Sequence, residues 1–199
     1  MPHWNYEYVR FPAPDNRALG KRLIDAGADI IIGSHPHIYQ GYEKYKSKYI
    51  FHSLGNFVFH SDVFRPISMV KDDTRINISF IVSVTLNGYS EYNTEIIPIY
   101  TDDNCVRPLE PEETVAFTKK MEKISSILNN EKMYKKYFYR DASGIAGQSE
   151  KMLKKLAAEQ GMRNLLKRVI KVRKQDVKVK FFSLFKKNKF RIKEKVKTP

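Results

Sequence analysis

Residues 28–32 form a short apolar, β-branched run, and this run most constrains what the chain can fold into. It reads Ala-Asp-Ile-Ile-Ile and stops at Gly33. A continuous apolar run of this length is typical of a strand buried on both faces, as in a helix-covered sheet. The stretch before it predicts a short helix, with Asp15 and Asn16 at its N-terminal cap and Gly27 at its end. Helix followed by buried strand is half of an α/β repeat, so we expect an α/β (α+β) fold.

Alternating apolar residues predict a β-hairpin in the middle of the chain. From residue 76 to 86 apolar and polar side chains alternate, apart from Ile81, which is the period of a half-buried strand. Asn87 and Gly88 follow, and residues 91–100 are expected to form the returning strand. A shorter strand–turn–strand unit is predicted over residues 49–59, with its turn at residues 53–56.

Charge divides the chain near residue 110. The net charge is +14, but residues 1–118 hold 11 Lys/Arg against 15 Asp/Glu, and residues 119–199 hold 25 against 7. Such a jump indicates two regions with different roles, or one folded unit with a basic tail. The composition also turns helical, and the main helix candidates are residues 112–128 and 149–174. We expect three parts: residues 1–108, a helical segment over residues 109–175, and a basic, partly disordered tail over residues 176–199.

Several classes of protein are disfavoured by composition. The single cysteine, Cys105, excludes an intrachain disulfide. No stretch approaches the roughly 20 apolar residues of a membrane span. The first residues lack the basic and then apolar pattern of a signal peptide.

The Gly-Ser-His-Pro-His stretch of residues 33–37 is the first candidate site. It directly follows the predicted buried strand, and ligand sites in open α/β sheets form outside the carboxyl ends of strands. The fixed φ of Pro36 stiffens the loop, so that His35 and His37 can turn toward one point. Imidazole is the commonest protein metal ligand and suits Zn, Fe and, with oxygen partners, Mn. The alternative is a structural or incidental histidine pair.

Three sequence blocks in a fixed order carry a family resemblance. They are residues 3–8 (HWNYEY), residues 26–37 (AGADIIIGSHPH) and residues 52–59 (HSLGNFVF). The chain resembles bacterial capsule-synthesis proteins of the poly-γ-glutamate type over roughly residues 1–100. That family resembles calcineurin-like metallophosphatases. The resemblance implies a partial metallophosphatase-like sandwich of sheets flanked by helices, with a helical, basic C-terminal extension.

The resemblance also implies a set of site residues. His3 is expected to be a lone histidine ligand, and His35 and His37 the final pair of ligands for a divalent metal (Mn, Fe or Zn). Glu7 is expected near the site as an acid/base or a substrate contact; the alternative is a solvated charge between two tyrosines. Asn5 stands where the family usually has Gly.

Three further polar residues are given structural interpretations. Asn56, after a glycine, is expected to be a turn residue rather than a ligand. His52 is expected to be a strand histidine before that turn, and His60 a surface histidine after it.

Half of the family's metal ligands have no counterpart in the sequence. The family places an Asp, a Gly-Asp and an Asn-His pair on strands before the histidine–tryptophan block, and here only Met1 and Pro2 precede His3. We therefore expect an N-terminally truncated reading frame or a split gene that is not a competent enzyme alone, with an upstream polypeptide as one source of the missing ligands.

The C-terminal residues 167–199 contain 14 Lys/Arg and 2 acidic residues, interleaved with Phe, Leu and Val. A solvated tail is one interpretation. Contact with an anionic polymer, such as poly-γ-glutamate or capsular polysaccharide, or with an anionic membrane surface is another. No recognition motif favours nucleic acid. The functional expectation is a capsule or poly-γ-glutamate biosynthesis protein of the cell envelope with a metal-dependent hydrolase fold. The alternative is a catalytically inactive fragment that binds an anionic polymer or membrane through this tail.

Overall fold

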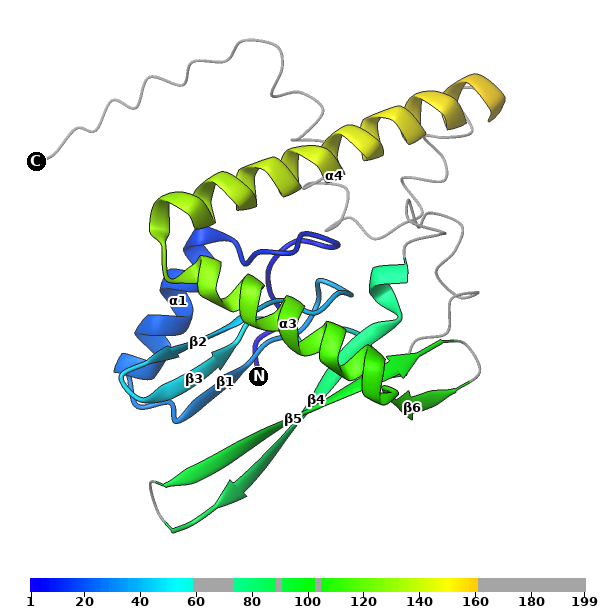
Figure 1. Ribbon diagram of the computed structural model, residues 1–199. Helices are drawn as coiled ribbons and strands as arrows, with labels where there is room; N and C mark the ends of the chain where they lie inside the picture. The colour runs from blue at the N-terminus through cyan, green and yellow to red at the C-terminus, as the bar shows by residue number, and fades with distance from the viewer. Residues whose placement is uncertain (59–73, 89–90, 103–104, 161–199) are drawn as a thin grey trace, which may run out of the picture. The chain divides into compact units, whose positions relative to one another are not determined.

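The computed structural model describes residues 1–58, 74–88, 91–102 and 105–160 (Figure 1). Met1–Ile145 form one compact unit, and a second unit begins at Ala146. The second unit is described only as the last part of a long helix, up to residue 160. His60 and the basic tail, for which predictions were made, lie outside the described residues.

The predicted helix and buried strand are both present. Helix α1 spans Pro14–Asp25 and strand β1 spans Ile30–Ile32. The predicted cap was wrong: Ala13 occupies the N-cap without a side-chain hydrogen bond, because the helix starts at a proline, whose fixed φ and missing N–H suit the first helical position. Gly27 follows the helix with φ +106°, in the left-handed region that favours glycine.

The first sheet has three strands in the order β1-β3-β2. Strand β2 spans Tyr42–Tyr45 and β3 spans Lys48–Phe51; β3 pairs antiparallel with β2 and parallel with β1. Strand β3 confirms the first strand of the predicted strand–turn–strand unit. The second strand was wrong over residues 57–58, which form a bend with exposed side chains.

The second sheet contains the predicted hairpin. Strand β4 (Ile78–Leu86) pairs antiparallel with β5 (Tyr92–Thr101), and β6 (Val106–Pro108), which was not predicted, adds a third strand. A short 3-10 helix at Thr74–Ile76 precedes β4. The presence of helices together with two three-stranded sheets confirms the α/β fold class.

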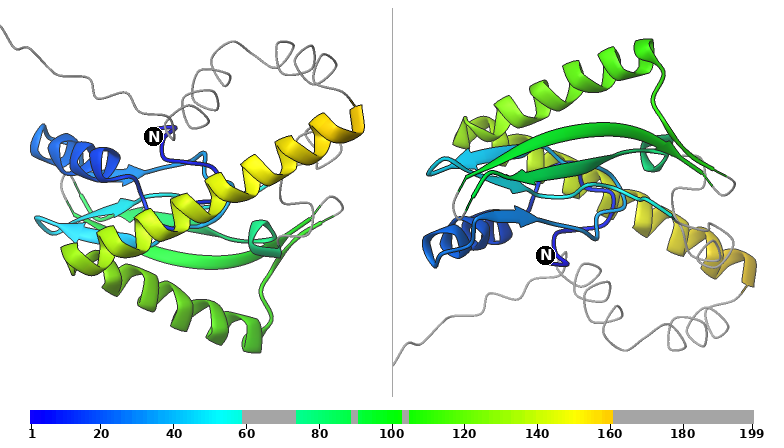
Figure 2. Two further views of the ribbon diagram at one scale, coloured as in Figure 1. Left: turned by 90° about the horizontal axis from the view of Figure 1, so that it is seen from above. Right: turned by 90° about the horizontal axis from the view of Figure 1, so that it is seen from below.

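The layers of the first unit follow from two apolar clusters. Alternate residues of β1 face opposite sides: Ile31 packs with Trp4, Ile24 and Ile50 under α1, whereas Ile30 and Ile32 face the larger cluster. That larger cluster joins the first sheet to the β4–β5 hairpin and to helix α3, Pro111–Leu128. In Figure 2, α1 covers one face of the first sheet, while the hairpin and α3 lie on the opposite side.

Helix α3 and the start of α4 complete the core. Helix α3 contributes Phe117, Met121, Ile124 and Leu128 to the larger cluster, and α4 (Glu131–Gln160) contributes Tyr134 and Phe138. Helix α4 therefore begins 18 residues before the predicted start at residue 149. The predicted boundary near residue 110 falls inside the first unit, between β6 and α3. No helix in the described part of the chain has the length and hydropathy to cross a membrane.

Candidate functional site

The segment that carries His3 is paired with the loop that carries His35. His3 forms a parallel β-bridge with Ser34, immediately after β1. The Ser34 N–H donates to the Pro2 carbonyl, and the Trp4 N–H donates to the Ser34 carbonyl, both at 3.1 Å. These bonds place His3 and His35 side by side, with ring centroids 4.4 Å apart.

Gly33 permits this close pairing. A Cβ atom at Gly33 would lie 2.2 Å from the His52 carbonyl oxygen and 2.3 Å from the Trp4 indole nitrogen. The Trp4 indole N–H donates to that same His52 carbonyl at 2.8 Å. Any side chain at residue 33 would therefore separate the His3 segment from the end of β3.

Four residues of the site adopt backbone conformations that are rare for non-glycine residues. Asn5 has φ +70°, Tyr8 has φ +62°, His35 has φ +108° and His37 has φ +60°. Such conformations cost on the order of 1–3 kcal/mol each and cluster at functional sites. Asn5, where the resembled family usually has Gly, is a residue type that tolerates the left-handed region. The structure therefore retains at Asn5 the backbone conformation that a glycine would adopt.

The three imidazoles lie on one surface but do not converge on one point. The His35 and His37 ring centroids are 6.1 Å apart, and His3 and His35 are 4.4 Å apart. Two imidazoles on one tetrahedral ion at about 2.0–2.1 Å have ring centres roughly 5 Å apart, so both spacings are near that value. Among the described residues, no three His, Cys, Asp or Glu side chains form a ready metal-binding group. The donors fit a transition metal in type, but the set is incomplete as it stands.

His37 is oriented by Asn56. His37 Nδ1 lies 3.0 Å from the Asn56 Oδ1 atom, and the Asn56 amide in turn donates to the Ile76 carbonyl at 3.5 Å. A proton on Nδ1 leaves the lone pair of Nε2 available to a metal ion. Metal-ligating histidines are commonly oriented in this way, by a hydrogen bond from the ring nitrogen that does not bind the metal. Tyr8 stacks on the His37 ring at 5.8 Å. Sequence reasoning treated Asn56 as a turn residue and missed this role.

Glu7 lies in a turn between Tyr6 and Tyr8, and its side chain is half-buried. Within the described residues, Glu7 does not join the proposed histidine ligands in a group that could hold a metal ion. Its expected acid/base role stays a prediction.

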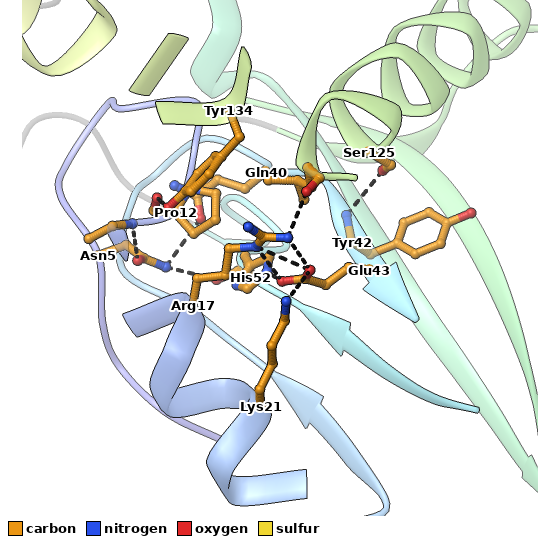
Figure 3. Close-up of polar contacts among 12 residues, drawn as sticks. Asn5, Pro12, Arg17, Lys21, Gln40, Tyr42, Glu43, His52, Ser125 and Tyr134 are labelled. Carbon is orange, nitrogen blue, oxygen red and sulfur yellow. Dashed lines mark hydrogen bonds and ion pairs between the residues drawn. The ribbon is translucent and has the colours of Figure 1, made fainter. Parts of the chain in front are cut away.

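Beneath the histidine loop lies a buried charged network that the sequence analysis did not find. Arg17 of α1 donates three hydrogen bonds to the Glu43 carboxylate of β2, at 2.7–3.1 Å (Figure 3). Two further side chains contact the Glu43 carboxylate: His52 Nε2 lies 2.9 Å from Oε1, and Lys21 Nζ lies 3.5 Å from Oε2. The side chains of Arg17 and Glu43 are 9% and 5% exposed, and His52 is fully buried, which confirms it as a structural histidine.

Arg17 also connects this network to the helices. One of its terminal nitrogens donates to the Leu128 carbonyl at the end of α3, and the other donates to Glu131 at the start of α4. Its guanidinium stacks over the Tyr134 ring at 4.7 Å. One side chain of α1 therefore joins β2 to the α3–α4 corner.

The ionisation of the network follows from burial and contacts. Burial alone would raise the pKa of Glu43, but the hydrogen bonds from His52 and Arg17 outweigh it and lower that pKa to about 2. Burial lowers the pKa of His52 despite its bond to Glu43, so the ring is neutral. Neutral His52 then donates its Nε2–H to the ionised Glu43. Within the described residues, His52 Nδ1 is buried without a hydrogen-bond partner.

Known proteins are similar to part of this chain, including the segments that carry the three histidines. Residues 1–61 match the family described as "Bacterial capsule synthesis protein PGA_cap". The chain is 36% identical over 107 residues to "Capsule biosynthesis protein CapA" of Bacillus anthracis, covering 54% of this chain and 24% of that protein. It is 51% identical over 57 residues to "PGA biosynthesis protein CapA" of Bacillus subtilis (strain 168), covering 29% of this chain and 15% of that protein.

The chain thus spans less than a quarter of the length of these two relatives. The matched residues 1–61 include all three sequence blocks on which the resemblance was based. Residues 1–61 thus match the bacterial capsule synthesis protein family that the sequence blocks predicted.

Proposed function

We propose that this chain supplies the histidine part of a metal-dependent hydrolase site that works in capsule or poly-γ-glutamate biosynthesis. His3, His35 and His37 are the proposed ligands of a divalent Mn, Fe or Zn ion. The observation that carries the proposal is the pairing of His3 with Ser34, which brings two imidazoles from distant parts of the chain to a ring separation of 4.4 Å. The positive backbone φ angles of His35 and His37 also support it, as does the hydrogen bond to Asn56 that orients the His37 ring.

Each residue has a defined part in this proposal. His35 and His37 bind from a rigid loop at the end of β1, and Asn56 fixes the His37 tautomer. His3 completes the set after a change in ring orientation, because the three rings do not converge as they stand. Glu7 is the proposed acid/base, reached from the turn that follows the His3 segment. A bound metal would supply a hydroxide nucleophile near neutral pH and would stabilise developing negative charge.

The missing carboxylate ligands must come from outside the described residues. Among the described residues, strand β1 pairs with β3 on one edge, and on the other edge the pairing is the bridge between His3 and Ser34, two residues after the strand. Its three isoleucines face apolar clusters on both sides, which is typical of an interior strand of a parallel sheet. We infer that a further strand, from an upstream polypeptide, pairs parallel to β1 and presents its ligands at the same edge as His35.

The names of the relatives guide the substrate and location that we propose. Both named relatives are described as biosynthetic proteins of capsule or PGA. We therefore propose an anionic polymer, poly-γ-glutamate or capsular polysaccharide, as the partner, and the cell envelope as the location. The anionic membrane surface remains an expectation for the basic tail alone.

Metal titration of the purified chain tests the proposal. We expect isothermal titration calorimetry to show binding of one Zn²⁺ ion, and the double variant His35→Ala plus His37→Ala to lose it. His60→Ala removes a histidine outside the proposed ligands and serves as the matched control. The proposal would be contradicted if the double variant still bound Zn²⁺, or if the wild-type chain bound no Zn²⁺.

A further inference from the structure

The buried Arg17–Glu43–His52 network reaches the histidine site through one backbone carbonyl. The carbonyl oxygen of His52 accepts the Trp4 indole N–H at 2.8 Å and the Asn5 amide N–H at 3.4 Å. Trp4 and Asn5 directly follow His3 in the chain. The position of the His52 backbone therefore determines where the His3 segment can lie.

The same carbonyl also sets the position of the histidine loop. Gly33 packs directly on it, and the Gly33 N–H donates to the carbonyl of the preceding residue, Phe51, at 2.8 Å. His35 follows two residues after Gly33. Residues 51–52 are thus a stretch of backbone that both the His3 segment and the His35 loop contact.

The His52 side chain is fixed by a hydrogen bond to an ionised carboxylate as well as by packing. Its Nε2–H is held by Glu43, which three Arg17 hydrogen bonds keep in place. A buried ring nitrogen without a partner, such as His52 Nδ1, costs about 1–3 kcal/mol. An apolar side chain would avoid that cost, and a buried ion pair is often no more stabilising than well-packed apolar residues. Stability alone therefore does not explain the choice of these residues.

We propose that Glu43, held by its hydrogen bonds to Arg17, is a positioning residue. It fixes the His52 ring, and the His52 carbonyl in turn sets the spacing of His3 and His35. The inference rests on the proposed function, because the spacing matters where the two imidazoles share a metal. A ring displaced by a fraction of an ångström loses its place in the coordination sphere, since metal–nitrogen distances vary by only about 0.2 Å. Residues that orient metal ligands from behind typically change metal affinity by about 10–100-fold.

Co²⁺ affinity of the full chain separates positioning from stability. The positioning variants are Glu43→Gln, which removes the charge, and Glu43→Asp, which keeps the charge on a shorter side chain. Met121→Ala is the matched control, because it removes a buried core side chain of α3 away from the network. Each variant is titrated with Co²⁺ at a temperature at which circular dichroism shows it folded.

The expected result is a loss of Co²⁺ affinity of at least tenfold in Glu43→Gln, against less than twofold in Met121→Ala. If Glu43→Gln does not fold, Glu43→Asp provides the comparison, with a smaller loss expected because either the ion pair with Arg17 or the hydrogen bond from His52 lengthens. A folded Glu43 variant with wild-type affinity overturns the inference while leaving the proposed function intact. An equal loss in Met121→Ala also overturns it. A wild-type chain that binds no Co²⁺ overturns both.

Discussion

Trp4 donates its indole N–H to the carbonyl oxygen of His52, 48 residues further along the chain, and Gly33 fills the space beside that bond. Three segments that are distant in sequence therefore meet at one hydrogen bond. His3, His35 and the end of β3 owe their proximity to this contact. The bond also gives the site a spectroscopic reporter, because Trp4 is the single tryptophan of the chain.

Replacement of Gly33 by alanine is expected to disrupt this meeting point. The new Cβ would lie 2.2 Å from a backbone oxygen, so the two segments must separate. Overpacking of this kind costs about 1–3 kcal/mol, and we expect the upper end because the obstructing atom is backbone. Urea unfolding followed by Trp4 fluorescence measures the loss. Gly144→Ala, at a helical position with open space around it, is the control and should stabilise by up to about 1 kcal/mol.

Removal of Arg17 is expected to be far more costly than removal of an exposed arginine. Arg17→Met leaves the Glu43 charge buried without its main partner, which costs about 3–5 kcal/mol. Arg107 forms a similar ion pair with Glu113, but both side chains are 38% exposed, so Arg107→Met should cost far less than Arg17→Met. Chemical denaturation of the two variants compares them directly. Equal losses in the free energy of unfolding would show that burial of the ion pair between Arg17 and Glu43 does not increase its contribution to stability.

Stability is expected to fall in acid in two overlapping steps. His52 is buried with a lowered pKa, so the unfolded chain binds its proton first, and stability decreases as the pH falls below about 6.5. The pKa of Glu43 is lowered to about 2, so its contribution is present above an unfolded value near 4.5 and is lost as the pH falls toward 2. Thermal unfolding midpoints from pH 8 to pH 2 test this. In Glu43→Gln the loss between pH 4.5 and pH 2 should be reduced.

A chain that ends at residue 108 is not expected to fold. It lacks Phe117, Met121, Ile124 and Leu128, which pack on the first sheet and the hairpin. Burial of each such side chain contributes about 1.5–3 kcal/mol, and the sum is comparable with the whole stability of a typical domain. A chain of residues 1–145 retains them and should give dispersed amide NMR signals. A dispersed spectrum from residues 1–108 would show that the helices are dispensable.

Short-range patterns in the sequence predicted much of this fold. The apolar run before Gly33 predicted β1, and the alternation before Asn87 predicted the β4–β5 hairpin, because both signals arise from burial of neighbouring residues. The early start of α4 was missed because two glycines near its middle, Gly144 and Gly147, weaken the helical pattern.

The buried network had no comparable signal. Arg17 and Glu43 are charged residues on a helix and a strand, where a solvated face is the usual reading. Their burial depends on α3 and α4, which cover them from more than 80 residues away in sequence. The role of Asn56 was missed for the same reason, since nothing local links it to His37.

X-ray absorption spectroscopy of the chain loaded with one equivalent of Zn²⁺ tests the central claim most directly. Zinc–nitrogen distances are about 2.0–2.1 Å, and imidazole rings add characteristic outer-shell scattering that allows them to be counted. The account predicts three imidazole ligands in the wild-type chain, whereas Zn²⁺ added to the double variant His35→Ala plus His37→Ala should give the spectrum of the solvated ion, because that variant does not bind it. A spectrum with no imidazole scattering, or one that the double variant leaves unchanged, would contradict it.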